Sequence, residues 1–125
     1  MYGYGGTILT IDVTNGQQRI EAFDAAYARK YLGGNGFAAK LCYDRIPRGI
    51  DVFDPQNLVI FATGPVTDSV IPGNNRNCVG GKSPLNGLFF DSTFGGRFAG
   101  TQRHTGFDAI VITGAAPEPV YLVVD

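Results

Sequence analysis

The stretch Thr7-Ile-Leu-Thr-Ile-Asp-Val13, which runs directly into Thr14-Asn-Gly16, decides the fold that this sequence predicts. Its apolar side chains alternate and so share one face, as they do in a half-buried β-strand. Asn-Gly tolerates the positive φ angles of a tight hairpin turn. The chain is therefore predicted to return as a second strand over Gln17–Phe23.

Two helices are expected after this hairpin. Asp24 is a good N-cap for an alanine-rich helix that extends to Leu32, where Gly33-Gly34 ends it. A second helix is predicted from about residue 36 to 45, because its apolar residues recur on one face, and Pro47 follows its end.

The rest of the chain predicts mainly short strands, with one further helix between Gly95-Gly96 and about His104. The expected strands cover residues 58–63, 77–80, 88–91, 107–113 and 120–124. Short turns join neighbouring strands, which favours an α+β fold with largely antiparallel β-sheets and a few short helices. Residues 1–125 are predicted to form a single domain. One connected core is expected to contain Leu9, Ile11, Phe37, Leu41, Val59, Phe61, Ile110 and Ile112.

Composition excludes several classes of protein. The chain has 125 residues, of which 44% are hydrophobic and 17% charged, so it is not a disordered tail. Its net charge of -1 and interspersed signs give no basic groove for nucleic acid. No apolar run approaches the roughly 20 residues that span a bilayer. Residues 1–6 do not resemble a secretory signal, so a cytoplasmic protein is expected.

The metal-ligating side chains are too few for a complete site. Cys42 and Cys78 form no CxxC pair, and two buried, reduced thiols are the expected state. His104 is the only histidine and has no partner at ligand spacing.

Two glycine-containing motifs resemble nucleotide sites but lack the required context. Gly34-Asn-Gly-Phe-Ala-Ala39 fits the GxGxxA fingerprint, yet a helix is predicted before it, where that fingerprint needs a strand. Gly81-Lys-Ser83 resembles the end of a P-loop, but Arg76 stands at the position of the first glycine and Pro84 follows directly. Neither motif predicts a nucleotide site.

Two segments remain as candidate binding sites. Arg76 lies in a polar, asparagine-rich loop, and a guanidinium suits a phosphate or a planar heterocycle. A surface salt bridge is the alternative role for this arginine. Gly95-Gly96 precedes a predicted helix, where free N–H groups attract anions, although a tight strand-to-helix turn explains the pair equally well. The carboxylates of Asp91 and Asp108 could act as general bases, but no residue near them in sequence forms a catalytic pair with either. Asp108 is expected to cap or fix a turn.

Taken in order, these and other segments resemble the N-terminal domain of the tungsten-containing aldehyde ferredoxin oxidoreductase family. The resemblance runs nearly end to end and lies in the order and spacing of its pieces. They are Gly6–Gly16, Tyr31–Gly36, Asp54–Leu58, Gly64–Thr67, Arg76, Lys82–Leu85, Gly95-Gly96, Gly106–Ile110 and Pro119–Tyr121.

The resemblance implies an anaerobic, cytoplasmic oxidoreductase that oxidises aldehydes to carboxylic acids and passes electrons to ferredoxin. It implies a tungsten ion held by two pyranopterins (tungstopterin), a magnesium ion between the pterin phosphates, and a nearby 4Fe-4S cluster. By the same resemblance, Arg76 contacts a pterin and Gly95, with Gly96 beside it, lies against the cofactor. Thr93 holds magnesium through its backbone carbonyl, at a position where some members have asparagine.

The sequence also departs from the family pattern. Asp68-Ser69 stands where Gly-Thr is common, and the family's cluster cysteines, second pterin loop and substrate channel lie downstream of this segment. The chain is therefore expected to bind cofactor as one segment of a larger oxidoreductase, together with further domains or subunits, and to be inactive alone. A cofactor-free interaction module and the tungsten subunit of an aromatic acyl-CoA reductase are the alternatives. The substrate, the choice of tungsten or molybdenum, and a homo-oligomeric state are left open.

Overall fold

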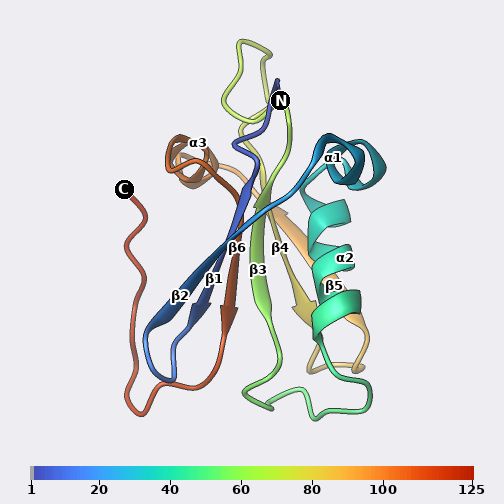
Figure 1. The fold of residues 1–125 in the computed structure, drawn as a ribbon, viewed down its shortest axis with the longest axis vertical. Helices are drawn as coiled ribbons and strands as arrows, with labels where there is room; N and C mark the ends of the chain where they lie inside the picture. Colours follow the sequence, from blue (N-terminus) through green and yellow to red (C-terminus); the bar gives the residue numbers. More distant parts are fainter. Residues whose placement is uncertain (1) are drawn as a thin grey trace.

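A computed structural model describes residues 2–125, and its strands form one sheet with three helices beside it (Figure 1). In chain order the elements are β1 (Thr7–Asp12), β2 (Gln17–Ala22), α1 (Ala25–Tyr31), α2 (Asn35–Arg45), β3 (Val59–Thr63), β4 (Asn77–Lys82), β5 (Phe89–Phe94), α3 (Phe98–His104) and β6 (Phe107–Thr113).

The six strands lie in the order β2-β1-β6-β3-β4-β5. Within residues 2–125, β1 and β6 pair in parallel and the other four neighbouring pairs are antiparallel. The predicted α+β fold with a largely antiparallel sheet is therefore confirmed. The last strand in sequence, β6, occupies a central position and joins the β1–β2 hairpin to the three strands β3, β4 and β5.

The main core lies between α2 and one face of this sheet. Phe37 and Leu41 project from α2 onto alternate residues of the central strands, such as Ile60 and Val111, which are fully buried. Figure 1 shows α2 lying along the β4–β5 side of the sheet. The connected cluster contains Ile8, Phe37, Ala38, Leu41, Cys42, Leu58, Ile60, Ala62, Cys78, Ala109 and Val111.

The predicted single core was wrong, because its eight residues divide between the two faces of the sheet. Phe37 and Leu41 belong to the α2-side cluster, but the six strand residues of the prediction do not. Leu9 and Ile110 pair directly across β1 and β6 and are buried on the opposite face, whereas Val59 is 42% exposed. Both parities of these strands are apolar, so alternation alone could not identify the face that the helix covers.

The predicted strand over residues 120–124 was also wrong. This segment is irregular and pairs with no strand of the described chain. Residues 122–125 instead border a cavity of about 310 Å³ together with Leu9, Ile11 and Ile110, on the face away from α2. This apolar segment thus approaches a sheet face and does not extend a sheet edge. The predicted strands at 77–80 and 88–91 both continue further, to Lys82 and Phe94.

The junction between α1 and α2 explains the glycines of the GxGxxA sequence. Asp24 caps α1, its Oδ1 accepting from the Tyr27 N–H at 2.8 Å, and Leu32 ends the helix with a left-handed φ of 63°. A Cβ on Gly36 would lie 1.9 Å from the Tyr31 carbonyl oxygen. Glycine is needed there because one helix end packs against the backbone of the other, and no strand precedes the motif.

Candidate functional site

The sheet brings the two candidate segments together at one end of β4 and β5. Asn77 pairs with Phe94, so Arg76, just before β4, and Gly95, just after β5, are neighbours across the two strands. The Asn75 Nδ2 atom donates a hydrogen bond to the Gly96 carbonyl oxygen at 2.7 Å. The structure therefore places these candidates side by side, while their role in binding a cofactor stays a prediction.

Arg76 is solvent-exposed and makes no ion pair within residues 2–125. The alternative role of this arginine, a surface salt bridge, therefore finds no partner in that part of the chain. A guanidinium without a carboxylate partner keeps its planar fork of donors for an anion or a flat ring. Arg76 could thus contact a phosphorylated heterocycle without first breaking an internal contact.

Side-chain hydrogen bonds hold the loop that carries Arg76. Thr67 is buried, and its hydroxyl accepts from the Gly64 N–H at 3.1 Å and donates to the Arg76 carbonyl at 3.4 Å. Asp68 pairs with His104 of α3 at 2.7 Å, which gives the single histidine a structural partner. The Arg76 carbonyl is consequently held by the buried Thr67, although the Arg76 side chain is exposed.

The glycine pair precedes α3, as the sequence predicted, and leads into it through a bend at Gly96 and Arg97. The helix α3 begins at Phe98 with Arg97 as its N-cap, so Gly95 and Gly96 precede its first turn. A helix of only seven residues also has a small dipole. What the bend offers is accessible backbone: both glycines are exposed, Gly96 has a φ of 99°, and no atom lies within 4 Å of a Cβ built on Gly96.

Thr93 lies in β5, which is an edge strand of the sheet. Its side chain is exposed and it pairs with Cys78 of β4. Edge strands present unpaired backbone groups, so a carbonyl in β5 can reach a ligand. Residues 2–125 contain no cluster of three or more His, Cys, Asp or Glu side chains that could hold a metal ion. A magnesium ion at Thr93 would therefore rely on backbone oxygens and on ligands outside this chain.

The remaining acids and thiols have structural roles. Asp91 accepts from the Asn35 amide at 2.6 Å, which ties β5 to the start of α2. Asp108 is 1% exposed and accepts from the Gly6 N–H at 2.7 Å, so it holds the distant N-terminal segment and not the local turn that the sequence predicted. Both cysteines are buried and free. Burial raises the pKa of Cys42 and of Cys78 to about 11, so both remain protonated thiols at neutral pH.

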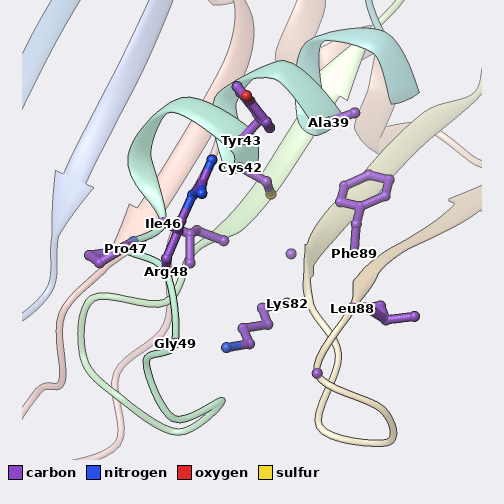
Figure 2. Close-up of a pocket in the computed structure, with 12 residues that line it drawn as sticks. Ala39, Cys42, Tyr43, Ile46, Pro47, Arg48, Gly49, Lys82, Leu88 and Phe89 are labelled. Carbon is purple, nitrogen blue, oxygen red and sulfur yellow. The ribbon is translucent and has the colours of Figure 1, made fainter.

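A pocket of about 530 Å³ lies at the opposite end of β4 from Arg76 (Figure 2). The C-terminal half of α2 and the β4–β5 turn form its walls, and the Lys82 amine donates to the Ile50 carbonyl beside it. Figure 2 shows the Phe89 ring on the wall opposite Cys42. From Arg76 to Gly81, the first β4 residue that lines the pocket, the chain advances five residue steps, a span of roughly 17 Å at 3.3 Å per residue. The two features are therefore separate.

Sequence reasoning missed Asn75, whose side chain connects the two candidate segments. The asparagines around Arg76 indicated a polar loop, and nothing in their spacing points to a partner 21 positions later. No helix in the described part of the chain is long and apolar enough to cross a membrane.

Comparison with known proteins identifies relatives along the whole chain. The sequence profile described as "Aldehyde ferredoxin oxidoreductase, N-terminal domain" matches residues 8–125. The chain is 40% identical over 124 residues to a tungsten-containing aldehyde ferredoxin oxidoreductase of Pyrococcus abyssi, covering 99% of this chain and 20% of that protein. It is 38% identical over 125 residues to the Pyrococcus horikoshii protein of the same description, covering 100% of this chain and 21% of that protein.

A solved structure shares the fold closely. The active site complex BamBC of benzoyl coenzyme A reductase, in complex with 1,5-dienoyl-CoA, superposes with a TM-score of 0.91 at 38% identity. The match covers 96% of this chain and 18% of the other. The chain thus spans about a fifth of the length of the proteins that it matches.

Proposed function

This chain belongs to the aldehyde ferredoxin oxidoreductase family, as its N-terminal domain, and on that basis we propose that it binds the tungstopterin of a larger oxidoreductase. In this proposal the complete enzyme is cytoplasmic, oxidises aldehydes to carboxylic acids and passes electrons to ferredoxin. The 4Fe-4S cluster is ligated outside this chain, and further domains or subunits complete the site. The observation that carries the proposal is the adjacency of the unpaired Arg76 and the open Gly95-Gly96 bend.

The residues present fit a phosphorylated pterin. Arg76 supplies a fixed cationic fork that can bind a phosphate or stack on a ring. The glycine bend lets a ligand approach the backbone closely, because a Cβ on Gly95 would meet only the Asn75 carbonyl oxygen, at 3.9 Å, and one on Gly96 would meet nothing. Thr93, two residues before the bend, is exposed on an edge strand, where its carbonyl is proposed to face magnesium.

The division of roles follows from this arrangement. When bound, tungstopterin supplies the redox centre of the enzyme. This chain supplies charge neutralisation at Arg76, backbone contact at Gly95 and Gly96, and a rigid sheet end that holds both in place. No acid or thiol of the described chain is proposed to act on the substrate, since Asp91, Asp108 and both cysteines have structural contacts or are buried.

Tungsten and pterin content of the purified holoenzyme tests the proposal. Arg76→Ala should weaken cofactor retention by about 1.5–3 kcal/mol, the contribution of a charged hydrogen bond. Gly95→Val should weaken it more, because the branched side chain fits the fold but obstructs the ligand. Arg48→Ala removes an exposed arginine at the far end of β4 and is the matched control. Full occupancy in both site variants would show that a structural turn has been mistaken for a binding site.

A second candidate function is the reduction of an aromatic acyl-CoA. The benzoyl coenzyme A reductase complex is 38% identical to this chain, about as similar as the aldehyde-oxidising relatives are, so this domain does not favour one chemistry over the other. Turnover of a panel of aldehydes with an oxidised viologen, compared with turnover of benzoyl-CoA and 1,5-dienoyl-CoA, would separate the two. Both readings keep the proposed cofactor site.

A further inference from the structure

We propose that Asn75 is a positioning residue that orients the Gly96–Arg97 peptide toward the cofactor, an inference that rests on the proposed function. The Asn75 Nδ2 atom donates to the Gly96 carbonyl oxygen at 2.7 Å. Within residues 2–125, this is the hydrogen bond that links the side chains of the Arg76 loop to the glycine bend. Asn75 therefore couples the two segments that are proposed to hold the same ligand.

The orientation of the Asn75 amide is fixed by what it faces. The Gly96 carbonyl is an acceptor, so only the amide nitrogen of Asn75 can satisfy it. The amide oxygen then points inward, where it is buried and has no hydrogen-bond partner. It lies beside Gly100 and the Asp68 carboxylate: a Cβ on Gly100 would be 3.6 Å from the Asn75 oxygen and 3.2 Å from Asp68 Oδ1. The Asp68 carboxylate has no donor for that oxygen, and the Gly100 N–H, in the first turn of α3, makes no hydrogen bond with it.

Burying an oxygen without a hydrogen-bond partner is unfavourable. Within the Asn75 side chain, this loss offsets the gain from the hydrogen bond to Gly96. An apolar side chain of similar size would avoid that loss in the folded chain. The geometry therefore points to a benefit outside fold stability, and the orientation of the bend supplies one.

The consequence for the bend follows from the planar trans peptide. In such a peptide the C=O of one residue and the N–H of the next point in opposite directions. Because Asn75 draws the Gly96 carbonyl toward the loop, the Arg97 N–H is turned away from the loop. Both glycines and Arg97 are exposed, so a ligand can approach the bend from solvent. A phosphate there would receive a donor whose direction is set in advance.

The variant Asn75→Leu separates positioning from stability. It removes the donor to Gly96 and also the unpaired buried oxygen, at similar side-chain volume. The matched control is Asn74→Leu: the Asn74 amide donates to the Ser69 carbonyl and hydroxyl, both at 2.8 Å, within the same loop and without contact to the bend. Both variants are made in the holoenzyme, with Arg76→Ala alongside.

Three readouts are compared: the rate of tungsten loss on dialysis, the thermal unfolding midpoint, and hydrogen exchange of the peptide that contains residues 95–98. Asn75→Leu should lose tungsten roughly tenfold faster, as expected for one hydrogen bond, and exchange faster at residues 95–98. Its unfolding midpoint, measured after the cofactor has been removed from all samples, should be unchanged or higher. Asn74→Leu should keep the wild-type rate of tungsten loss.

Other outcomes overturn the inference in distinguishable ways. If Arg76→Ala loses tungsten but Asn75→Leu retains it, Asn75 does not position the bend. If Asn74→Leu loses tungsten as fast as Asn75→Leu, or if Asn75→Leu lowers the midpoint of the cofactor-free protein, the residue stabilises the loop and not the site. If all three variants retain tungsten fully, the proposed cofactor site itself is wrong.

Discussion

Replacing the buried Asp108 with alanine should lower the free energy of unfolding more than any exposed substitution in this chain. The Asp108 carboxylate is 1% exposed and has three donors: the Gly5 N–H at 3.1 Å, the Gly6 N–H at 2.7 Å and the Arg103 guanidinium at 2.8 Å. These contacts join the segment before β1 to α3 and β6. Alanine would leave two backbone donors and a partly buried arginine without their acceptor.

The size of the effect follows from those contacts. A hydrogen bond to a charged group contributes about 1.5–3 kcal/mol, and breaking a buried ion pair by removing one partner costs about 3–5 kcal/mol. The three contacts share one carboxylate and are not additive, so about 3–5 kcal/mol is expected for the whole substitution. Asp108→Asn keeps one acceptor oxygen and should cost about 2 kcal/mol.

Urea unfolding followed by circular dichroism at pH 7 measures these differences. Asp12→Ala is the matched control, because the Asp12 carboxylate is on the surface and accepts a single N–H, from Thr14 at 2.9 Å. That variant should lose about 1 kcal/mol or less. The reasoning would be refuted if Asp108→Ala were no more destabilising than Asp12→Ala.

Three further predictions concern packing, titration and activity. Gly36→Ala should destabilise the chain by about 3 kcal/mol in the same urea assay, because its Cβ would lie 1.9 Å from the Tyr31 carbonyl oxygen. The control Gly64→Ala has room for a Cβ and should cost under about 1 kcal/mol, so equal losses in the two variants would contradict the prediction. Burial raises the pKa of Cys42 and Cys78 from about 9 to about 11, so the unfolded chain loses these thiol protons at a lower pH than the folded chain does. The free energy of unfolding should therefore fall as pH rises from 9 to 11. A urea midpoint that stays constant over this interval would show that the thiols are not buried. The isolated chain should not oxidise aldehydes with a viologen dye, since it has two cysteines and a 4Fe-4S cluster needs four thiolates; turnover by the chain alone would refute this.

Local features of the fold could be predicted from the sequence. The β1–β2 hairpin follows from alternation and an Asn-Gly turn, and α1 begins where Asp24 can cap it. Both depend on residues a few positions apart. The choice of sheet face could not be predicted, because Leu9 and its neighbour Ile8 are both buried, on opposite sides. Only the placement of α2, a long-range contact, decides which of them joins the main core.

The candidate site shows the same limit. Arg76 and the glycine pair were identified as separate binding segments, and their adjacency depends on the pairing of β4 with β5. The helix predicted after Gly95-Gly96 is present as α3, which begins at Phe98 with Arg97 as its N-cap, while the anion-binding role of the pair stays a prediction. Residues 120–124 form a continuous apolar run, as a buried strand would, but strand formation needs a free edge with matching register, and this segment pairs with none in the described sheet.

The central position of β6 has a consequence for synthesis on the ribosome. Residues 7–22 can form their hairpin early, and residues 59–94 can form a three-stranded meander, but only residues 107–113 connect them. Until that stretch has emerged, β1 and β3 each present an unpaired edge, and such edges invite pairing with other chains. Nascent chains of this domain should therefore be prone to edge-to-edge pairing until residue 113 has emerged, and slower translation before residue 107 should increase their aggregation.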